Sequence, residues 1–473
     1  MVQDEALPLG DVVSEECFAQ AFEEHGIDFG RDEGVVYTPA ITLWGLISQV
    51  FYSGEQRSTK AAATRIAALW ATLGRVVCST NNGAYCKARM KIGDAVVRTI
   101  TTRIAERVER LMQSDRHASE PGEPLSNASD HLHAIQAGPP TGRLVLADGF
   151  TVTAADTEEN QEEYPQNSSQ KEGLGFPILR CVGLICLTTG MLLDLAEGPY
   201  SGKETGETAL LWKQLVRLQP GDILVADRYY CTYWILAACQ QRGVHVVMRN
   251  HHRREDAPTG AKRISKYQRI ATWKRPAKPE WMSPDDYAQM PASLKVRLVD
   301  VHVDQPGCRT RRFTVTTTLL DSRQFTREWI TSVYGGRWAV ELDIRSIKCS
   351  LGMDILRAKT PGMVRTELWS CLLAYNLIRQ KILASALAEG RCPRSMSFAA
   401  TMQMLATTWL LNAVIDAAEV LRQLHDENAR SIKVGHRTGR IEPRANKRRP
   451  KRLALLTKPR HAAVEQLIAA SDA

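Results

Sequence analysis

The sequence predicts an α/β core that is flanked by two helical regions and interrupted by a β-rich segment. Short apolar runs alternate with helical patterns in the middle of the chain, as in a central sheet covered on both faces. The runs are 144–147, 223–226 and 244–248, and the helical patterns are 205–218 and 233–242. Helical spacing dominates before residue 115 and after residue 326, while two alternating runs, 296–303 and 313–319, indicate strands between them.

The N-terminal region 40–115 is predicted to contain three helices. Apolar residues recur at helical spacing over 41–51, after Thr38 and Pro39 as a cap and first-turn pair. An alanine-rich run follows at 58–73, and a third run, 81–111, opens with a basic, amide-rich cluster. Short helices with such an entry resemble a helix-turn-helix DNA reader. A plain helical bundle with a solvated basic face explains the same pattern.

The rest of the chain shows clear changes of pattern. Polar residues with Pro and Gly predict a linker over 113–142, and 178–195 is predicted to be a β-hairpin with Thr189-Gly190 at its turn. The segment 250–325 is predicted to be a β-rich insertion that begins with a charged stretch. Helical patterns return over 326–387 and 395–427, and the tail 430–460 carries twelve Lys and Arg against one acid, Glu442.

Composition excludes several classes of protein. The 473 residues are enough for two to four domains, and the apolar (44%) and charged (24%) fractions are typical of globular proteins. No uninterrupted apolar stretch is long enough for a transmembrane helix, and the acidic N-terminus does not resemble a secretory signal. The eleven cysteines never form C-x-x-C, which argues against a disulfide framework and a zinc ribbon. We therefore expect a cytoplasmic protein without membrane contact.

Charge is distributed unevenly along the chain. Residues 1–40 hold ten acids and one base, Arg31. Because the whole chain carries a net charge of +9, the remainder carries +18. A body this basic suggests a polyanionic partner, most simply nucleic acid, although a basic enzyme without such a partner is equally compatible.

Two segments of similar sequence each place an aspartate where an apolar run ends. Asp148 follows the run 144–147, and Asp227 follows the run 223–226. A carboxylate at the end of a buried strand is costly to desolvate, so it usually has a cation, a metal or a helix N-terminus beside it. Two such carboxylates on neighbouring strands could hold a divalent metal. Alternatively, each aspartate simply opens a turn and caps the next residues of the chain.

The segment 334–351 predicts a helix with one charged edge. At 100° per residue, four polar residues share a stripe that lies beside an apolar stripe; the polar residues are Arg337, Glu341, Arg345 and Lys348, and the apolar ones are Val340, Ile344, Ile347 and Leu351. Gly335 and Gly336 are predicted to mark the helix start, with Tyr334 in the preceding turn. A surface helix laced with ion pairs, such as Arg337 with Glu341, explains the same pattern.

These carboxylates fit one kind of chemistry. Cleaving a phosphodiester requires an activated water or hydroxyl in line with a leaving oxygen, and two divalent ions about 3.5–4 Å apart stabilise both oxygens. Mg²⁺ is held by few carboxylates, with phosphate and water completing its coordination. Two strand-end aspartates and one helix glutamate would form such a site, and basic groups on the same helix would bind phosphates.

The sequence resembles a known family at this point. Tyr334, Arg337, Glu341 and Lys348 fit the spacing Y-x2-R-x3-E-x6-K, which is similar to the signature of the bacterial insertion-sequence DDE transposases of the "insertion sequence four" family. Asp148 and Asp227 fall where that family's two aspartates are expected. The segments 351–361 and 367–379 are also similar to family sequences, and the resemblance covers 140–240 and 320–385.

The resemblance implies a ribonuclease-H-like catalytic core with Asp148, Asp227 and Glu341 as metal-binding triad. Its cofactor would be Mg²⁺, with Mn²⁺ as a substitute, at two ions per active site. Asp227 and Glu341 are 114 residues apart, and in this family a mostly β insertion fills that gap. Asp156, Asp194, Glu204 and Glu207 are further acids that could be confused with triad members, of which Asp156 is interpreted as solvated.

The resemblance also implies how DNA is bound. Arg337 and Lys348 would hold phosphates near the transposon end, Tyr334 would contact the strand that is not transferred, and Arg345 belongs to the same cationic edge. Family members cut through a DNA hairpin intermediate in which a flipped base stacks on a Trp of the insertion. Trp273 and Trp281 are the candidates here, because any base offers a face for stacking, although packing explains each of them as well.

The expected protein is therefore a DNA transposase that binds inverted terminal repeats and catalyses cut-and-paste strand cleavage and transfer. Its partners would be double-stranded DNA, at the transposon ends and the target, and a second copy of the chain on paired ends, in a bacterial cytoplasm near the nucleoid. A catalytically inactive or domesticated relative and a nuclease that never joins strands are the alternatives. The predicted division is 1–125 (terminal-repeat binding), 126–249 and 326–390 (core), 250–325 (insertion) and 391–473 (dimerisation and DNA contact).

Overall fold

The computed structural model describes residues 15–32, 34–76, 78–118, 135, 138–139, 141–202, 205–256, 258–302, 312–388, 390–408, 423–424 and 455–471. Several predicted features lie outside these residues. They are most of the linker, Glu204, the helix beyond residue 408 apart from residues 423–424, and the basic tail up to residue 454. Among the described helices, none is both long and apolar enough to cross a membrane.

The N-terminal region is helical, as predicted. Its helices are α1 (Glu15–Glu24), α2 (Pro39–Phe51), α3 (Thr59–Thr72), α4 (Gly83–Ile92) and α5 (Asp94–Ala118), with a 3₁₀ turn, η2, at Gly54–Arg57. The side chain of Thr38 accepts a hydrogen bond from the amide of Ile41, which starts α2 at Pro39. Ser58 caps α3 in the same way through the amide of Ala61.

One predicted helix is divided in two. The pattern over 81–111 predicted a continuous run, but the chain turns at Gly93, whose φ of 70° is readily adopted only by glycine. Asp94 then lies in the first turn of α5. The prediction of a single helix was wrong because helical periodicity continues across a one-residue break.

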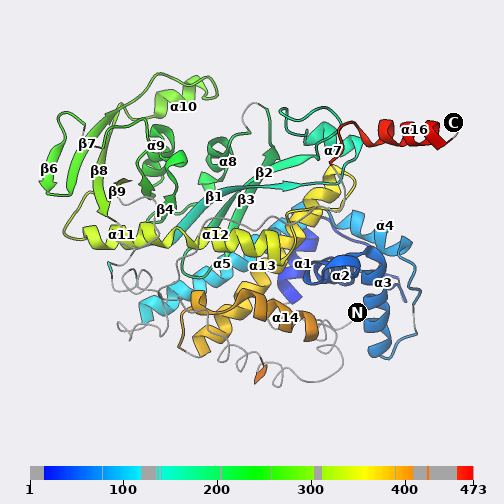
Figure 1. The fold of residues 1–473 in the computed structure, drawn as a ribbon. Coiled ribbons are helices and arrows are strands. Elements are labelled where there is room, and N and C mark those ends of the chain that lie inside the picture. The colour runs from blue at the N-terminus through cyan, green and yellow to red at the C-terminus, as the bar shows by residue number, and fades with distance from the viewer. Residues whose placement is uncertain are drawn as a thin grey trace, which may run out of the picture.

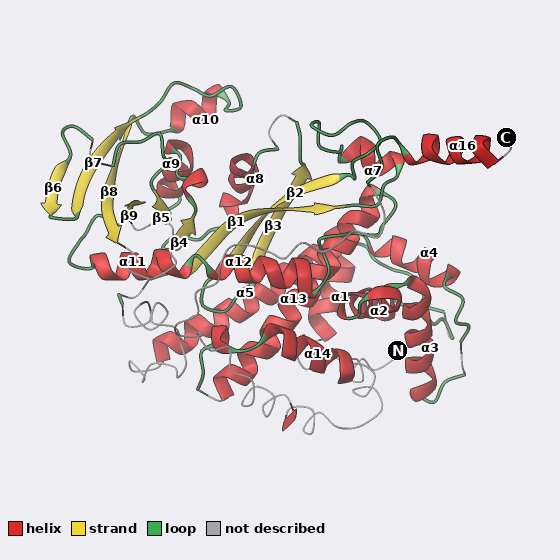
Figure 2. Ribbon diagram, viewed as in Figure 1, coloured by secondary structure: helices red, strands yellow, loops and turns green. Residues whose placement is uncertain are grey.

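A nine-stranded mixed sheet forms the centre of the protein (Figures 1 and 2). The spatial order is β3-β2-β1-β4-β5-β9-β8-β7-β6. The bounds are β1 (Leu144–Thr153), β2 (Ile178–Cys186), β3 (Leu192–Pro199), β4 (Ile223–Ala226), β5 (His245–Arg249), β6 (Lys262–Ser265), β7 (Gln268–Lys274), β8 (Ser293–His302) and β9 (Arg312–Thr317). The predicted hairpin is β2–β3, with Gly190 at a φ of 78° in its turn.

The two halves of this sheet differ in strand direction. β1, β4 and β5 are parallel neighbours, whereas β2 and β3 pair antiparallel on one side. On the other side β9, β8, β7 and β6 continue the sheet antiparallel from β5. The β-rich segment after residue 250 therefore extends the central sheet by four strands, with α10 (Pro284–Gln289) between β7 and β8.

Helices cover both faces of the sheet (Figure 1). On one side lie α8 (Glu207–Gln214) and α9 (Tyr233–Gln241), and on the other α5, α11 (Arg327–Gly336), α12 (Ala339–Arg345) and α13 (Pro361–Ala388). α7 (Glu158–Glu163) lies at the end of the sheet and contacts α13. Two 3₁₀ turns, η3 (Leu215–Arg217) and η4 (Arg228–Tyr230), follow α8 and β4. α13 is buried along most of its length, and it joins the sheet to the N-terminal helices.

The C-terminal part is helical where it is described. After α13 come a 3₁₀ turn, η6 (Pro393–Ser395), α14 (Phe398–Thr408) and α16 (Arg460–Ser471). α14 packs on α13 and α2. α16 projects from the body of the protein beyond α7 (Figure 1).

The helix that carries the Y-R-E-K residues is not continuous. Tyr334, Gly335 and Gly336 lie inside α11, so the prediction that the glycines mark a helix start was wrong. Gly336 packs closely on Leu187, where an added Cβ would lie 3.0 Å from its Cδ2. The chain breaks at Arg337 and Trp338, resumes as α12, and then forms a π-helical turn, η5 (Ser346–Ser350). A π turn inside a helix is often found at functional sites.

Candidate active site

Asp148 and Asp227 lie on adjacent parallel strands. Ala147 of β1 is opposite Ala226 of β4, so the next residue on each strand is one of the two aspartates. Asp227 lies where β4 ends, and its Oδ1 accepts a hydrogen bond from the amide of Arg228 at 2.6 Å. It therefore caps a turn, as the simpler interpretation predicted, and it also lies beside Asp148.

The prediction that β1 ends at Asp148 was wrong. β1 continues to Thr153 because it remains paired with β2, whereas β4 has already left the sheet. Asp148 thus sits on a strand whose β4-side edge has just become open. Its Oδ1 accepts a hydrogen bond from the amide of Gly149 at 2.9 Å.

Glu341 on α12 is linked to Asp148 through the guanidinium of Arg337. The side chain of Arg337 is buried, and its Nη2 donates to Oε1 of Glu341 at 3.2 Å. Its Nη1 lies 3.9 Å from Oδ2 of Asp148. Burial alone would lower the pKa of Arg337, but this pKa is raised because Tyr334 and all three carboxylates favour the positive charge. One buried cation therefore lies among the three carboxylates.

The carboxylates crowd one another around Asp148. Burial raises the pKa of Asp148 to about 6, and the negative charges of Glu207 and Glu341 add to this, against the lowering effects of the Gly149 amide and Arg337. Glu341 is 44% exposed and can approach a bound group from solvent.

The donor set fits a divalent metal. Carboxylate oxygens are the ligands that Mg²⁺ prefers, and a concentration of negative charge at a half-buried position is what a divalent cation would neutralise. Within the described ranges, no three His, Cys, Asp or Glu side chains are grouped closely enough to bind a metal as they stand. Arg337 instead bridges Asp148 and Glu341, so metal binding would require the Glu341 side chain to turn away from the guanidinium.

Tyr334 and Lys348 flank the carboxylates. The ring of Tyr334 is buried, 5.3 Å from that of Phe313, and burial raises the pKa of its hydroxyl to about 12. Lys348 lies in the π turn, and its Nζ donates to the carbonyl oxygen of Thr151 at 2.6 Å. Lys348 therefore ties the helical segment to β1, three residues beyond Asp148. Arg345 is exposed at the end of α12.

The two tryptophans of the insertion occupy different environments. Trp273 on β7 is 6% exposed, and the guanidinium of Arg254 lies 3.8 Å from the centre of its ring. Trp281 is 41% exposed and packs edge-on against Trp212 of α8, with ring centres 5.3 Å apart. Of the two, Trp281 presents the more accessible aromatic surface.

Three acids that could be confused with the triad have other roles or positions. Asp194 is buried, and Arg98 and Arg217 both pair with it. Asp156 is exposed and accepts a hydrogen bond from Gln161, in agreement with its interpretation as solvated. Glu207 lies at the start of α8, and its Oε2 accepts a hydrogen bond from the hydroxyl of Tyr230 at 3.0 Å.

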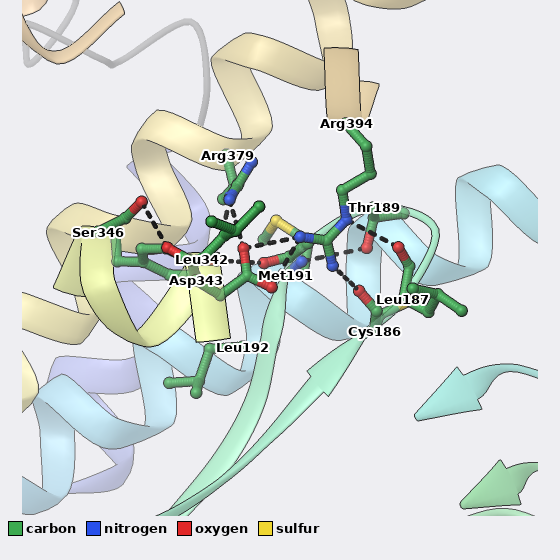
Figure 3. Close-up of polar contacts among 12 residues, drawn as sticks. Cys186, Leu187, Thr189, Met191, Leu192, Leu342, Asp343, Ser346, Arg379 and Arg394 are labelled. Carbon is green, nitrogen blue, oxygen red and sulfur yellow. Dashed lines mark hydrogen bonds and ion pairs between the residues drawn. The ribbon is translucent and has the colours of Figure 1, made fainter. Parts of the chain in front are cut away.

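Sequence reasoning missed an acid that anchors α12, the helix that carries Glu341. Asp343 on α12 is fully buried, and Figure 3 shows Arg379 of α13 and Arg394 converging on its carboxylate. Arg394 donates to both carboxylate oxygens at 2.7 Å and also to the carbonyls of Cys186 and Leu187 at the end of β2. This network joins α12, α13 and β2 two residues from Glu341. The available signal was the place of Asp343 beside the apolar stripe.

The raised pKa of Asp148 predicts a stability effect. In metal-free protein, Asp148→Asn should increase the free energy of unfolding at pH 8 by up to about 3 kcal/mol, since each pKa unit corresponds to about 1.4 kcal/mol. Because its pKa is raised, the carboxyl of Asp148 holds its proton more tightly in the native state than in the unfolded chain. The stability that this protonation contributes is fully present below pH 3.8 and is lost as the pH rises through about 6. Urea unfolding at several pH values measures this.

The pH dependence is the control for that prediction. Asparagine mimics the protonated acid, so the advantage of the variant should shrink steadily as the pH falls from 7 to 4. Saturating Mg²⁺ should also remove it, because a bound cation stabilises the ionised carboxylate. An advantage that is independent of both pH and Mg²⁺ would contradict a strained charge at Asp148.

Comparison with known proteins identifies the family of this chain. A family model described as "Transposase DDE domain" matches residues 139–377, about half of the chain. The chain is 25% identical over 382 residues to the transposase InsG for insertion sequence element IS4 of Escherichia coli (strain K12), covering 78% of this chain and 76% of that protein. A piggyBac transposase synaptic complex with hairpin DNA is a distant structural match, at a TM-score of 0.41 and 10% identity over 90% of this chain and 85% of that one.

Proposed function

The chain belongs to the DDE transposases, and on this basis we propose that it binds the inverted terminal repeats of an insertion sequence and moves the element by cut-and-paste strand cleavage and transfer. The resemblance to the insertion-sequence-four transposases is confirmed by the family model and the bacterial relative. The protein is thus an enzyme of DNA transposition, and we propose that it acts near the nucleoid in a bacterial cytoplasm.

One observation carries the proposed mechanism. Asp148, Asp227 and Glu341 come from two strands and a distant helix, yet the buried guanidinium of Arg337 lies 3.9 Å from Oδ2 of Asp148 and 3.2 Å from Oε1 of Glu341. Asp227 follows the residue of β4 that is opposite Ala147, next to Asp148. A surface helix with internal ion pairs would leave Arg337 exposed and would not involve the aspartates. We infer that these are the three acids of the DDE triad, in a ribonuclease-H-like core built on β1, β4 and α12.

Each residue would have a distinct task. Asp148, Asp227 and Glu341 would hold Mg²⁺, two ions in our proposal, with Mn²⁺ as a substitute. Bound there, the metal would supply an activated nucleophile and stabilise the leaving oxygen. Once released from Glu341, the buried guanidinium of Arg337 can bind a phosphate oxygen with paired donors. Lys348 would position the strand β1 and present its charge to the DNA backbone, beside the exposed Arg345.

The aromatic residues suggest how the DNA end is distorted. We propose that the phenol of Tyr334, which stays protonated at neutral pH, donates a hydrogen bond to the strand that is not transferred. The DNA hairpin route requires a flipped base, and Trp281 has exposed surface to stack on it. Trp273 could take that place only if the guanidinium of Arg254 moved away from its ring.

The N-terminal helices are the proposed reader of the terminal repeats. In the basic cluster that opens α4, both amide side chains make hydrogen bonds within the protein. The Oδ1 of Asn81 accepts from the amide of Gly83, and Asn82 donates to Thr59 of α3 at 2.6 Å. Lys87 and Lys91 are exposed on the same helix and available to phosphates. We propose that α4 contacts DNA, and that the C-terminal region 391–473 supports a homodimer on paired ends.

Lys87→Ala should weaken terminal-repeat binding and flatten its salt dependence. Loss of one phosphate contact reduces the slope of log K against log salt by about 0.9. Fluorescence anisotropy at several salt concentrations measures this slope. Lys171→Ala, an exposed lysine on the loop between α7 and β2, is the matched control and should keep the wild-type slope. Equal slopes for both variants would place the DNA elsewhere.

Cleavage of a labelled duplex carrying the element's terminal repeat tests the proposed function as a whole. With Mg²⁺ or Mn²⁺ we expect nicking at the repeat boundary, a DNA hairpin product and joining to a target duplex. Tight binding without cleavage in either metal would favour an inactive or domesticated relative. Cleavage without joining would favour a nuclease on the same fold.

A further inference from the structure

The carboxylate of Glu207 lies against the backbone of β1 next to Asp148. A Cβ added to Gly149 would be 2.4 Å from the carboxylate carbon of Glu207 and 2.7 Å from each of its oxygens. Gly149 has no positive φ, so glycine is required here by space and not by backbone conformation. The missing side chain at 149 is therefore what admits the carboxylate to this edge of the sheet.

A second contact fixes Glu207 from the other strand. The hydroxyl of Tyr230 donates to its Oε2 at 3.0 Å, and Tyr230 is buried in the turn that Asp227 caps. Glu207 is thus linked to β1 through Gly149 and to the end of β4 through Tyr230. Gly149 directly follows Asp148, and Tyr230 lies in the turn that Asp227 caps, so Glu207 lies beside both of the positions that carry the aspartates. Glu207 and Asp148 are both only partly buried, so both remain accessible from solvent.

Helix capping does not account for this placement. Glu207 is in the first turn of α8, where an acid gains typically about 0.3–1 kcal/mol from the helix dipole. Such an acid would gain this equally well if it pointed into solvent. Its carboxylate instead lies against β1 beside Asp148, and two carboxylates in a half-buried site are unfavourable unless a cation offsets their charge.

We propose that Glu207 is a fourth acidic group of the catalytic centre, which holds the divalent cation together with Asp148, either directly or through a water, with Tyr230 fixing its orientation. This proposal rests on the proposed metal-dependent function of the same site. It assigns Gly149 a role as well, because any larger residue would displace the Glu207 carboxylate.

Mn²⁺ binding to the full chain, measured by titration calorimetry, tests the proposal independently of DNA cleavage. Glu207→Gln should weaken Mn²⁺ binding about 10–100-fold, the usual cost of losing a group that supports a metal site. The amide oxygen of glutamine can still accept the Tyr230 hydrogen bond, so the variant should fold, as circular dichroism would verify. Glu328→Gln is the matched control, because Glu328 is an exposed acid in the first turn of α11.

Gly149→Ala supplies a second, independent variant. The added methyl meets only the end of a flexible side chain, so the fold should persist while the carboxylate is pushed aside. Its Mn²⁺ affinity should fall like that of Glu207→Gln, and the double variant should lose no more than either single one, since both remove the same group. Additive losses would mean that Gly149 acts on Asp148 directly, which would overturn the assignment of Gly149.

The outcomes separate this proposal from the proposed function. Wild-type Mn²⁺ affinity in Glu207→Gln, with loss of binding in Asp148→Ala, would overturn the role of Glu207 and leave the triad intact. Suppose that Glu207→Gln binds Mn²⁺ more weakly and that the wild-type protein binds a terminal repeat without ever cleaving it. The first result would support the fourth acid, and the second would refute the transposition activity.

Discussion

Glu341→Gln should abolish strand cleavage at a terminal repeat while leaving binding to that repeat unchanged. The glutamine has nearly the same shape but carries no charge, so Arg337 loses the negative charge of its partner at 3.2 Å and the site loses one metal-binding carboxylate. Electrostatic stabilisation by a bound metal is worth several kcal/mol, and about 1.4 kcal/mol corresponds to a tenfold change in rate. We therefore expect a loss of about 10³-fold or more in single-turnover cleavage.

Two measurements distinguish this result from simple misfolding. Anisotropy with a labelled repeat should give the wild-type dissociation constant, because Glu341 is not expected to contact DNA outside the reaction centre. Asp354→Asn, an exposed acid shortly after the π turn, should cleave at the wild-type rate. If Glu341→Gln and the control Asp354→Asn both cleave at the wild-type rate, the assignment of Glu341 as the third acid is wrong.

Asp343→Asn should be the most destabilising single change near the site, by about 3–5 kcal/mol, the cost of removing one partner from a buried ion pair. Asp343 is 0% exposed, and two guanidiniums, Arg379 and Arg394, would be left in the core without a counter-charge. The midpoint of urea unfolding should move accordingly. Asp28→Asn removes the partner of Arg31 in an exposed ion pair and should cost less than about 1 kcal/mol.

A triple variant separates stability from positioning. Replacing Asp343, Arg379 and Arg394 together by Leu, Met and Met should restore much of the stability, since apolar groups often replace a buried ion cluster without loss. If the network also positions α12, this variant should still cleave more slowly than wild type, because Arg394 would no longer hold the end of β2. If the triple variant recovers both the stability and the cleavage rate of the wild type, the network serves stability alone.

Features that depend on neighbouring residues could be predicted from the amino-acid sequence. The cap formed by Thr38, the apolar strands before Asp148 and Asp227, and the spacing of Tyr334, Arg337, Glu341 and Lys348 are all local. Each is set by propensities and contacts within a few residues. These features were sufficient to predict the helical N-terminal region, the alternation of strands and helices, and the family.

The groups that meet across the fold are known only from the tertiary structure. Glu207 reaches Gly149 because α8 packs on β2 and β3, and Asp343 is buried against two arginines, Arg379 of α13 and Arg394 of η6. The break at Gly93 and the position of Gly336 inside α11 were mispredicted for a related reason. A glycine is compatible with a helix, a turn or a close contact, and the choice is made by the free energy of packing against residues that are distant in the sequence.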